Sequence, residues 1–323
     1  MRRSRSSRGR ATVQSAPRTC AAIFGQSVAS NTSNEYAAMS RVAVLGMGLL
    51  GSGFAEGLLS RGGTELVVWN RTAAKTEPLV ALGATSAPSP AEAVRGAERV
   101  HLVLLDDDTV DATIAEFQAA LHPDAVIVDH TTNQPARTAA RAAALESAGI
   151  KYLHAPVMMG PGAARAAKGM MLVAGLTARF ESVKEALTEM TGEVWHVGER
   201  TDLAAVYKLF GNASTLSVVG VLADVMRMAD AADVERSGVL EMLAKVNLNG
   251  PLGLRGTMMA TGNYEPNFTL DVARKDLRLM LETAGDAPTP MLAALAARMD
   301  EEIANGRGNE DFAIIGKGSG VAV

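Results

Sequence analysis

The sequence predicts an α/β protein with a doubly wound, mainly parallel sheet, followed by an all-helical C-terminal domain. Between residues 41 and 198, short and continuously apolar runs alternate with helix-like segments, a pattern typical of parallel strands covered on both faces. A glycine-rich turn joins the first apolar run to the first helical segment. After Gly198 the strand pattern stops and long helical patterns follow.

The predicted strands are short apolar runs, each bounded by turn residues. They cover Val42–Leu45, Leu66–Trp69, Val100–Leu105, Ala125–Val128, Tyr152–Ala155, Met170–Ala174 and Val194–Val197. Helices are predicted between them, from the glycine turn to Leu59, over Ala73–Leu82 and over Ala136–Ala148.

The C-terminal domain is predicted to hold helices over Asp202–Asp230, Arg236–Val246, Asp271–Ala284 and Pro290–Ala304. The first of these stretches lacks proline and is rich in Ala, Val, Leu and Met, which predicts one long, largely buried helix joining the two domains. Asn249-Gly-Pro251 and Gly262-Asn-Tyr-Glu-Pro266 are interpreted as breaks. The predicted boundaries are 1–38 for a basic tail, 39–200 for the sheet domain and 201–323 for the helical domain.

The composition excludes several classes of protein. With a net charge of −4 the chain offers no broad basic surface, so we expect no nucleic-acid partner. No apolar run approaches the roughly 18 residues that span a bilayer, so we expect no membrane segment. Cys20 is the one cysteine, which rules out an intrachain disulfide and favours a reducing, cytoplasmic location.

Residues 1–38 differ from the rest of the chain. They contain six arginines against one acid, Glu35, with frequent serine and no apolar periodicity, which predicts a disordered segment. Two interpretations stay open. The segment has the composition of an organelle transit peptide, or it is an extension upstream of a start at Met39, which directly precedes the first strand.

The turn after the first strand reads Gly46-Met47-Gly48-Leu49-Leu50-Gly51 and opens a helix. Its glycines allow a tight turn and let the backbone approach a pyrophosphate, which the helix N-terminus stabilises. In this strand–turn–helix context we interpret all six residues as a dinucleotide-binding, Rossmann-type fingerprint. The alternative is a glycine-rich turn that binds no ligand.

The residues after the second strand discriminate between dinucleotides. NAD enzymes usually place Asp or Glu there to bind the ribose hydroxyls, whereas this chain has Asn70-Arg71-Thr72. The neutral Asn70 does not repel a 2′-phosphate, and Arg71 offers that phosphate a forked cation. We therefore expect Asn70, Arg71 and Thr72 to bind the cofactor and to favour NADPH over NADH. The alternative is that Arg71 is only a solvated residue that begins a helix.

Four patches, in order along the chain, carry a resemblance to a known family. They are Val44-Leu-Gly-Met-Gly-Leu-Leu-Gly51, Asp129-His-Thr-Thr-Asn-Gln-Pro135, Ala155-Pro-Val-Met-Met-Gly160 with Ala164, and Lys208-Leu-Phe-Gly-Asn212, followed by Lys275-Asp276. From about Arg41 to Lys317 the chain resembles the β-hydroxyacid dehydrogenases, which include 3-hydroxyisobutyrate dehydrogenase, tartronate semialdehyde reductase and glyoxylate/succinic semialdehyde reductases.

The resemblance implies an oxidoreductase that transfers a hydride between the nicotinamide and a small carbonyl or 3-hydroxyacid substrate. It implies further cofactor contacts from Leu104, Leu105, Thr132 and Lys275, the last reaching the site from the helical domain. It implies substrate contacts from Met158, Met159, Gly160 and Asn212. It also implies a homodimer or homotetramer in which helical domains pack on neighbouring subunits.

Lys208 and Asn212 are the predicted catalytic pair. Their i, i+4 spacing puts both on one face of the predicted long helix. Burial among apolar neighbours would lower the pKa of the lysine toward the range useful for acid–base work. From the spacing alone, a lysine that extends to water is an equal alternative. By the resemblance, Lys208 donates a proton to the developing alkoxide, and Asn212 holds the substrate or Lys208.

Two segments depart from the family pattern. Met158-Met159-Gly160 replaces a Ser-Gly-Gly segment that holds the substrate carboxylate, so a larger or more apolar carbonyl compound is one alternative and methionines that only pack are another. Leu203-Ala-Ala-Val-Tyr207 is similar to the matching segment of imine reductases, which keeps C=N reduction open. A non-catalytic cofactor-binding module is a further alternative, which the retained Lys208 disfavours.

We expect no metal, because the five histidines are scattered along the chain. Asp106-Asp-Asp108 is interpreted as a solvated loop at a strand end rather than as an acidic metal site. His130 and His154 flank the motif patches and are interpreted as structural residues.

Overall fold

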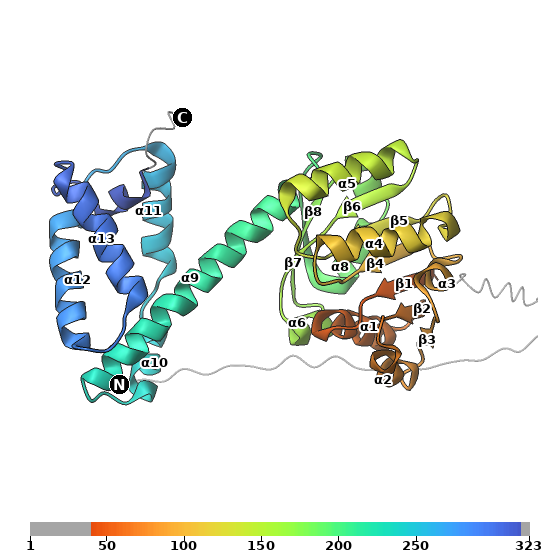
Figure 1. The fold of residues 1–323 in the computed structure, drawn as a ribbon, viewed down its shortest axis with the longest axis horizontal. Coiled ribbons are helices and arrows are strands. Elements are labelled where there is room, and N and C mark those ends of the chain that lie inside the picture. The colour runs from red at the N-terminus through yellow and green to blue at the C-terminus, as the bar shows by residue number, and fades with distance from the viewer. Residues whose placement is uncertain (1–39, 318–323) are drawn as a thin grey trace, which may run out of the picture. The chain divides into compact units, whose positions relative to one another are not determined.

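The computed structural model describes residues 40–317 (Figure 1). The predicted tail, 1–38, lies outside the described residues. The described part consists of a nine-stranded sheet with helices, followed by a region built of helices. The predicted fold class is therefore confirmed.

The sheet has the strand order β3-β2-β1-β4-β5-β6-β8-β7, with β9 paired to β8. The pairings from β3 to β6 are parallel, whereas β8 runs antiparallel to β6 and β7. The strands are β1 (Ser40–Leu45), β2 (Thr64–Trp69), β3 (Thr85–Ser86), β4 (Arg99–Leu102), β5 (Val126–Asp129), β6 (Lys151–His154), β7 (Val157–Met158), β8 (Gly169–Ala174) and β9 (Gly192–Gly198).

Helices cover both faces of this sheet. They are α1 (Leu49–Arg61), α2 (Glu77–Val80), α3 (Pro90–Val94), α4 (Asp107–Phe117), α5 (Pro135–Ser147), α6 (Pro161–Arg165), α7 (Thr177–Glu181) and α8 (Lys184–Thr191). One apolar core contains Phe54 of α1 and Leu187 of α8. The core on the other face contains Phe117 of α4 and Leu145 of α5. Strands buried on both faces explain the continuous apolar runs.

Two predicted elements of the sheet domain are shorter than expected. The strand predicted over Val100–Leu105 ends at Leu102, because the chain turns there and the Leu104 amide donates to Thr131 instead of to a strand. The helix predicted over Ala73–Leu82 is a 3₁₀ turn, η1 (Ala73–Thr76), followed by α2. Pro78 has no N–H to continue a hydrogen-bonded ladder across that junction.

The C-terminal region contains α9 (Leu203–Ala231), α10 (Arg236–Lys245), α11 (Asn249–Thr261), α12 (Leu270–Ala284), α13 (Pro290–Ala304) and the 3₁₀ turn η3 (Phe312–Gly316). Its core gathers side chains from α12, α13 and η3, among them Leu277, Leu292 and Ile314. The break predicted at Asn249-Gly-Pro251 is wrong, because α11 begins there. A proline in the first helical turn is tolerated, since the N–H it lacks has no partner in that turn.

Helix α9 leads from the sheet to the C-terminal helices (Figure 1). It contacts β7, β8 and β9 as well as α10, α12 and α13. The buried carboxylate of Asp224 accepts hydrogen bonds from the amides of Met291 and Leu292, 2.8 and 3.0 Å away, and so holds the beginning of α13 against α9. This contact matches the preference of helix N-termini for negative charge.

The prediction that α9 is largely buried is wrong for this chain. Its buried residues are Ala204, Ala205, Asp224 and Ala229, while Leu216 and Val219 are 72% and 58% exposed. By length and composition alone, α9 could also cross a membrane. Long apolar helices that do not enter a membrane meet the same criterion, so the expectation of no membrane partner stays a prediction.

Candidate active site

All the predicted cofactor residues except Lys275 lie at one edge of the sheet. Strands β2, β1, β4 and β5 are neighbours and parallel, so the loops that follow them leave from the same edge. These loops contain the glycine turn after β1, Asn70 to Thr72 after β2, Leu104 and Leu105 after β4, and Thr132 after β5. Dinucleotides bind at this carboxyl edge in doubly wound sheets.

The glycine turn has the shape that a pyrophosphate requires. A Cβ at Gly46 would overlap the Val103 carbonyl, and one at Gly51 would overlap the Gly46 carbonyl, so backbone packs directly on backbone. A Cβ at Gly48 would meet nothing within 4 Å. Gly48 caps α1, whose first turn has no acidic residue and no side-chain cap. Free backbone N–H groups and open space therefore meet at the same place, which fits a bound phosphate group.

Asn70 supports the glycine turn directly. Its side-chain oxygen accepts a hydrogen bond from the Met47 amide at 2.9 Å, and its side-chain nitrogen donates to the Thr72 carbonyl at 2.9 Å. Arg71 is exposed, and no described carboxylate pairs with it. The guanidinium is therefore available to a ligand at the end of β2.

The loops after β4 and β5 are joined to each other. The Leu104 amide donates to the hydroxyl of Thr131 at 3.0 Å. Thr131 is buried, whereas its neighbour Thr132 and Leu105 are exposed. The sequence motif does not distinguish the two threonines, but burial does. Thr131 connects the loops, and Thr132 is free to face a ligand.

The segment Met158–Gly160 lies next to both the glycine-turn helix and α9. It leads into α6, and α6 packs so closely on α1 that a Cβ at Gly53 would contact the Pro161 carbonyl. On its other side, the Met158 side chain fills the space that a Cβ at Gly211 would need. This segment therefore connects the predicted cofactor turn to the helix that carries Lys208.

Lys208 is half-buried at this junction. Its Nζ donates to the Val157 carbonyl at 2.8 Å and lies 3.6 Å from the Met158 sulfur. Burial lowers the pKa of the Lys208 amine below its ordinary value. No described carboxylate forms an ion pair with it, so nothing nearby offsets that effect. The Val157 carbonyl is a partner that sequence analysis did not predict, because a backbone acceptor leaves no residue-type signal.

Among the described residues, no hydrogen bond joins Lys208 to the two remaining predicted residues, Asn212 and Lys275. Asn212 and Lys208 both lie on α9, one turn apart. Lys275 is exposed on α12, where it pairs with Asp276. Helix α12 packs on α9, α13 and η3.

The histidines near the motifs are buried. The His130 ring donates through Nδ1 to the Ala155 carbonyl at 2.7 Å, and its Nε2 shares a 2.9 Å hydrogen bond with Nδ1 of His101. Burial lowers the pKa of His130 to about 4, so the ring is neutral at pH 7. His154 is also fully buried, and burial lowers its pKa as well. The described residues contain no group of three or more His, Cys, Asp or Glu placed to hold a metal ion.

The interpretation of Asp106-Asp-Asp108 as a solvated loop is wrong for Asp107, which is buried in the first turn of α4. Asp106 caps α4 by accepting from the Thr109 amide at 2.9 Å. Asp107 is buried and pairs with Arg141. Asp106 and Asp108 are exposed, and the side chain of Asp108 pairs with Arg137. Three consecutive acids give no sequence signal of which one faces inward.

A cavity of about 520 Å³ lies elsewhere, where β4, β5 and β6 begin. Its lining includes Arg99, Val126, Lys151 and Arg179, and it contains none of the predicted site residues. Because it lies at the amino edge of the parallel strands, it is not the dinucleotide site.

Comparisons with known proteins show the family of this chain. Residues 41–198 match the NAD binding domain of 6-phosphogluconate dehydrogenase, and residues 203–317 match the domain described as NAD-binding of NADP-dependent 3-hydroxyisobutyrate dehydrogenase. The chain belongs to the β-hydroxyacid dehydrogenase family. It is an NAD(P)-binding oxidoreductase of that family, which also has imine reductases as structural neighbours.

Two curated relatives span nearly the whole chain. Glyoxylate/succinic semialdehyde reductase 2, chloroplastic, of Arabidopsis thaliana is 27% identical over 90% of this chain and 82% of its own length. 3-Sulfolactaldehyde reductase of Escherichia coli is 28% identical over 86% and 95%. Among solved structures, the imine reductase from Myxococcus stipitatus in complex with NADP⁺ superposes with a TM-score of 0.79 at 24% identity, over 85% of this chain and 98% of that one. At this identity the last match shows the shared fold.

The glycine turn leads to a test that separates binding from folding. Gly48→Ala should leave the melting temperature unchanged, because its Cβ enters open space, and should weaken dinucleotide binding about tenfold, or about 1.4 kcal/mol. Gly51→Ala should instead lower the melting temperature, because its Cβ meets the Gly46 carbonyl. Thermal unfolding and titration with NADPH measure the two effects. Unchanged affinity in Gly48→Ala would show that the turn does not hold the cofactor.

Proposed function

We propose that this protein is an NADPH-dependent reductase of small carbonyl compounds, with Lys208 as the general acid. The proposal rests on the Lys208 amine, which is half-buried, has a lowered pKa and donates a hydrogen bond to the Val157 carbonyl. That carbonyl directly precedes the segment Met158–Gly160, which connects α9 to α1 through α6. The relatives whose names give a reaction include semialdehyde and sulfolactaldehyde reductases, which act on aldehydes.

The proposed roles follow from the chemistry of the residues present. When bound, the nicotinamide supplies the hydride. The glycine turn holds the pyrophosphate by backbone N–H groups, and Arg71 pairs with the 2′-phosphate. Lys208 donates a proton to the carbonyl oxygen as negative charge develops there, and the Val157 carbonyl orients its Nζ. Asn212, one turn further on the same helix, holds the substrate.

The substrate end of the site is apolar. Where the family pattern has a serine hydroxyl, Met158 packs against Gly211 and touches Lys208, so its side chain lines the place where a carbonyl substrate would meet the amine. This environment favours a carbonyl compound with an apolar flank over a small, strongly hydrated hydroxyacid. It also suits a cyclic imine, so C=N reduction is the second candidate function, and the similarity of Leu203–Tyr207 to imine reductases supports it.

A second copy of the chain is proposed as the partner. The exposed apolar side chains of α9 and α11 include Phe210, Leu216, Val218, Val219, Leu252 and Leu254. Patches of this kind mark interfaces, and Lys208 lies on the same helix, two residues before Phe210. A homodimer would cover α9 and would place a partner's helical region near the exposed amine end of the site.

The role of Lys208 is tested by Lys208→Met. Turnover of an aldehyde should fall roughly 10²- to 10⁴-fold, while NADPH affinity stays within about twofold, because the amine is assigned to the substrate and not to the cofactor. In the native enzyme, reduction requires the protonated amine, so its rate should fall as pH rises through the lowered pKa of Lys208. Steady-state rates with succinic semialdehyde, glyoxylate and a cyclic imine measure both effects. Turnover that survives in Lys208→Met would contradict the assignment.

Cofactor preference is tested by Arg71→Ala. Loss of the guanidinium should weaken NADPH binding by about tenfold or more, and should leave NADH binding unchanged, because only NADPH carries the 2′-phosphate. The ratio of the two dissociation constants is the measurement. The exposed Lys75 in η1 provides a control, since Lys75→Ala removes a nearby cation that is not assigned to the cofactor. Equal losses for both dinucleotides would rule out the proposed role of Arg71.

The proposed dimer is tested by charge on the exposed face of α9. Leu216→Lys combined with Val219→Lys should convert a dimer into a monomer, because desolvating two lysines opposes burial of that face. Light scattering after size exclusion gives the mass. Leu82→Lys, at an equally exposed leucine of the sheet domain, serves as control and should remain dimeric. A native protein that elutes as a monomer at micromolar concentration would exclude the dimer.

A further inference from the structure

The two loops expected to flank the nicotinamide are held from behind by buried carboxylates. Asp129, at the end of β5, is fully buried and accepts from the Thr131 amide at 2.9 Å and from the Asn133 side chain at 2.7 Å. Asp107, the first residue of α4, accepts from the Gln134 amide at 2.9 Å. The loop after β5 is thus fixed on both sides of the exposed Thr132.

One cation is shared by these carboxylates. Arg141 of α5 has a side chain that is only 4% exposed, and its Nη2 donates to Asp107 at 2.7 Å. Its Nε donates to Asp111, and its Nη1 lies 3.7 Å from Asp129. Although burial lowers the pKa of Arg141, the hydrogen bonds to Asp111 and Asp107 raise it above the ordinary value, so the group stays charged.

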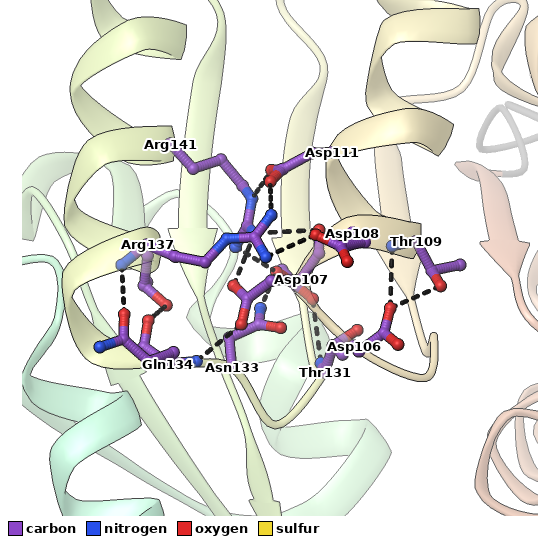
Figure 2. Close-up of polar contacts among 12 residues, drawn as sticks. Asp106, Asp107, Asp108, Thr109, Asp111, Thr131, Asn133, Gln134, Arg137 and Arg141 are labelled. Atoms are coloured by element: carbon purple, nitrogen blue, oxygen red, sulfur yellow. Dashed lines mark hydrogen bonds and ion pairs between the residues drawn. The ribbon is translucent and has the colours of Figure 1, made fainter.

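Arg137, one turn earlier on α5, makes a matched but exposed set of contacts. It pairs with Asp108 and, like Arg141, with Asp111, each at 2.6 Å (Figure 2). Its guanidinium contacts neither Asp107 nor Asp129. The two arginines share a helix and a carboxylate, and they differ in whether they reach the acids that hold the loop.

We propose that Arg141 is a positioning residue which, through Asp107 and Asp129, holds Thr132 and the joined Leu104 loop in the conformation that binds the nicotinamide half of the cofactor. The inference rests on the proposed function. Without Arg141, the buried carboxylates of Asp107 and Asp129 lose their shared cation, and such charges are costly when unpaired. The loop amides they hold would then shift, and small displacements of positioned groups weaken binding steeply.

The experiment compares two ligands in the full-length protein. NADPH would contact the whole proposed site. Adenosine 2′,5′-bisphosphate (2′,5′-ADP) lacks the nicotinamide, its ribose and the phosphate attached to that ribose. Binding of 2′,5′-ADP should therefore depend on the residues at the end of β2 and not on Thr132. Arg141→Met should weaken NADPH binding by about tenfold to a hundredfold and leave 2′,5′-ADP binding within about twofold. Arg137→Met should leave both unchanged. Asp107→Asn, which keeps the shape of the side chain, should resemble Arg141→Met and serves as the deciding variant if Arg141→Met does not fold.

The outcomes are distinguishable. A selective loss of NADPH affinity supports the positioning role, because general destabilisation would reduce both affinities together. Equal losses for both ligands, or no loss in either Arg141→Met or Asp107→Asn, overturn the inference alone. A native protein that binds neither ligand overturns the proposed function, and this inference with it.

Discussion

Backbone packed directly on backbone at the turn between β1 and α1 is the constraint on which the rest of the site depends. Gly51 lies against the Gly46 carbonyl, and Gly46 lies against the Val103 carbonyl. This packing lets α1 begin immediately beneath the sheet edge, with its N–H groups unobstructed. The same helix lacks a Cβ at Gly53, where it meets α6. The close approach at Gly53 brings α6 against α1, and the Met158 segment that precedes α6 packs on α9 at Gly211.

The half-buried Lys208 and the buried Arg141 have opposite environments. Lys208 has a carbonyl acceptor and no described carboxylate partner, and burial lowers its pKa. Arg141 is more deeply buried but pairs with Asp107 and Asp111, and its pKa is raised. The difference is that carboxylates compensate the desolvated charge of Arg141, whereas no described carboxylate compensates that of Lys208. An uncompensated amine can give up a proton, which suits a general acid, whereas a compensated guanidinium remains fixed, which suits a positioning role.

The helical region has a core of its own but leaves apolar side chains of α9 exposed in the described chain. Its own core is formed by α12, α13 and η3, and Asp224 of α9 holds the beginning of α13. The middle of α9 has apolar side chains without a cover in the chain itself. The sequence pattern predicted burial for this helix because composition reports only that a surface is apolar. It does not report which molecule covers that surface.

The sequence by itself determined the main strands of the sheet, the glycine turn and the long helix. Their signals are the apolar runs, the spacing of the glycines and the absence of proline, and each of these acts locally along the chain. It also placed Lys208 and Asn212 on one helical face. Only the tertiary structure decided that Thr131 is buried and Thr132 exposed, that Asp107 and not Asp108 faces inward, and that the Val157 carbonyl accepts a hydrogen bond from Lys208. Neighbouring residues of the same type differ in the packing around them, and that packing comes from elements distant in the sequence. The break predicted at Pro251 failed for the same reason. In the sequence, a proline in the first turn of a helix cannot be told from a proline that ends one, and the packing of the neighbouring helices decides between them.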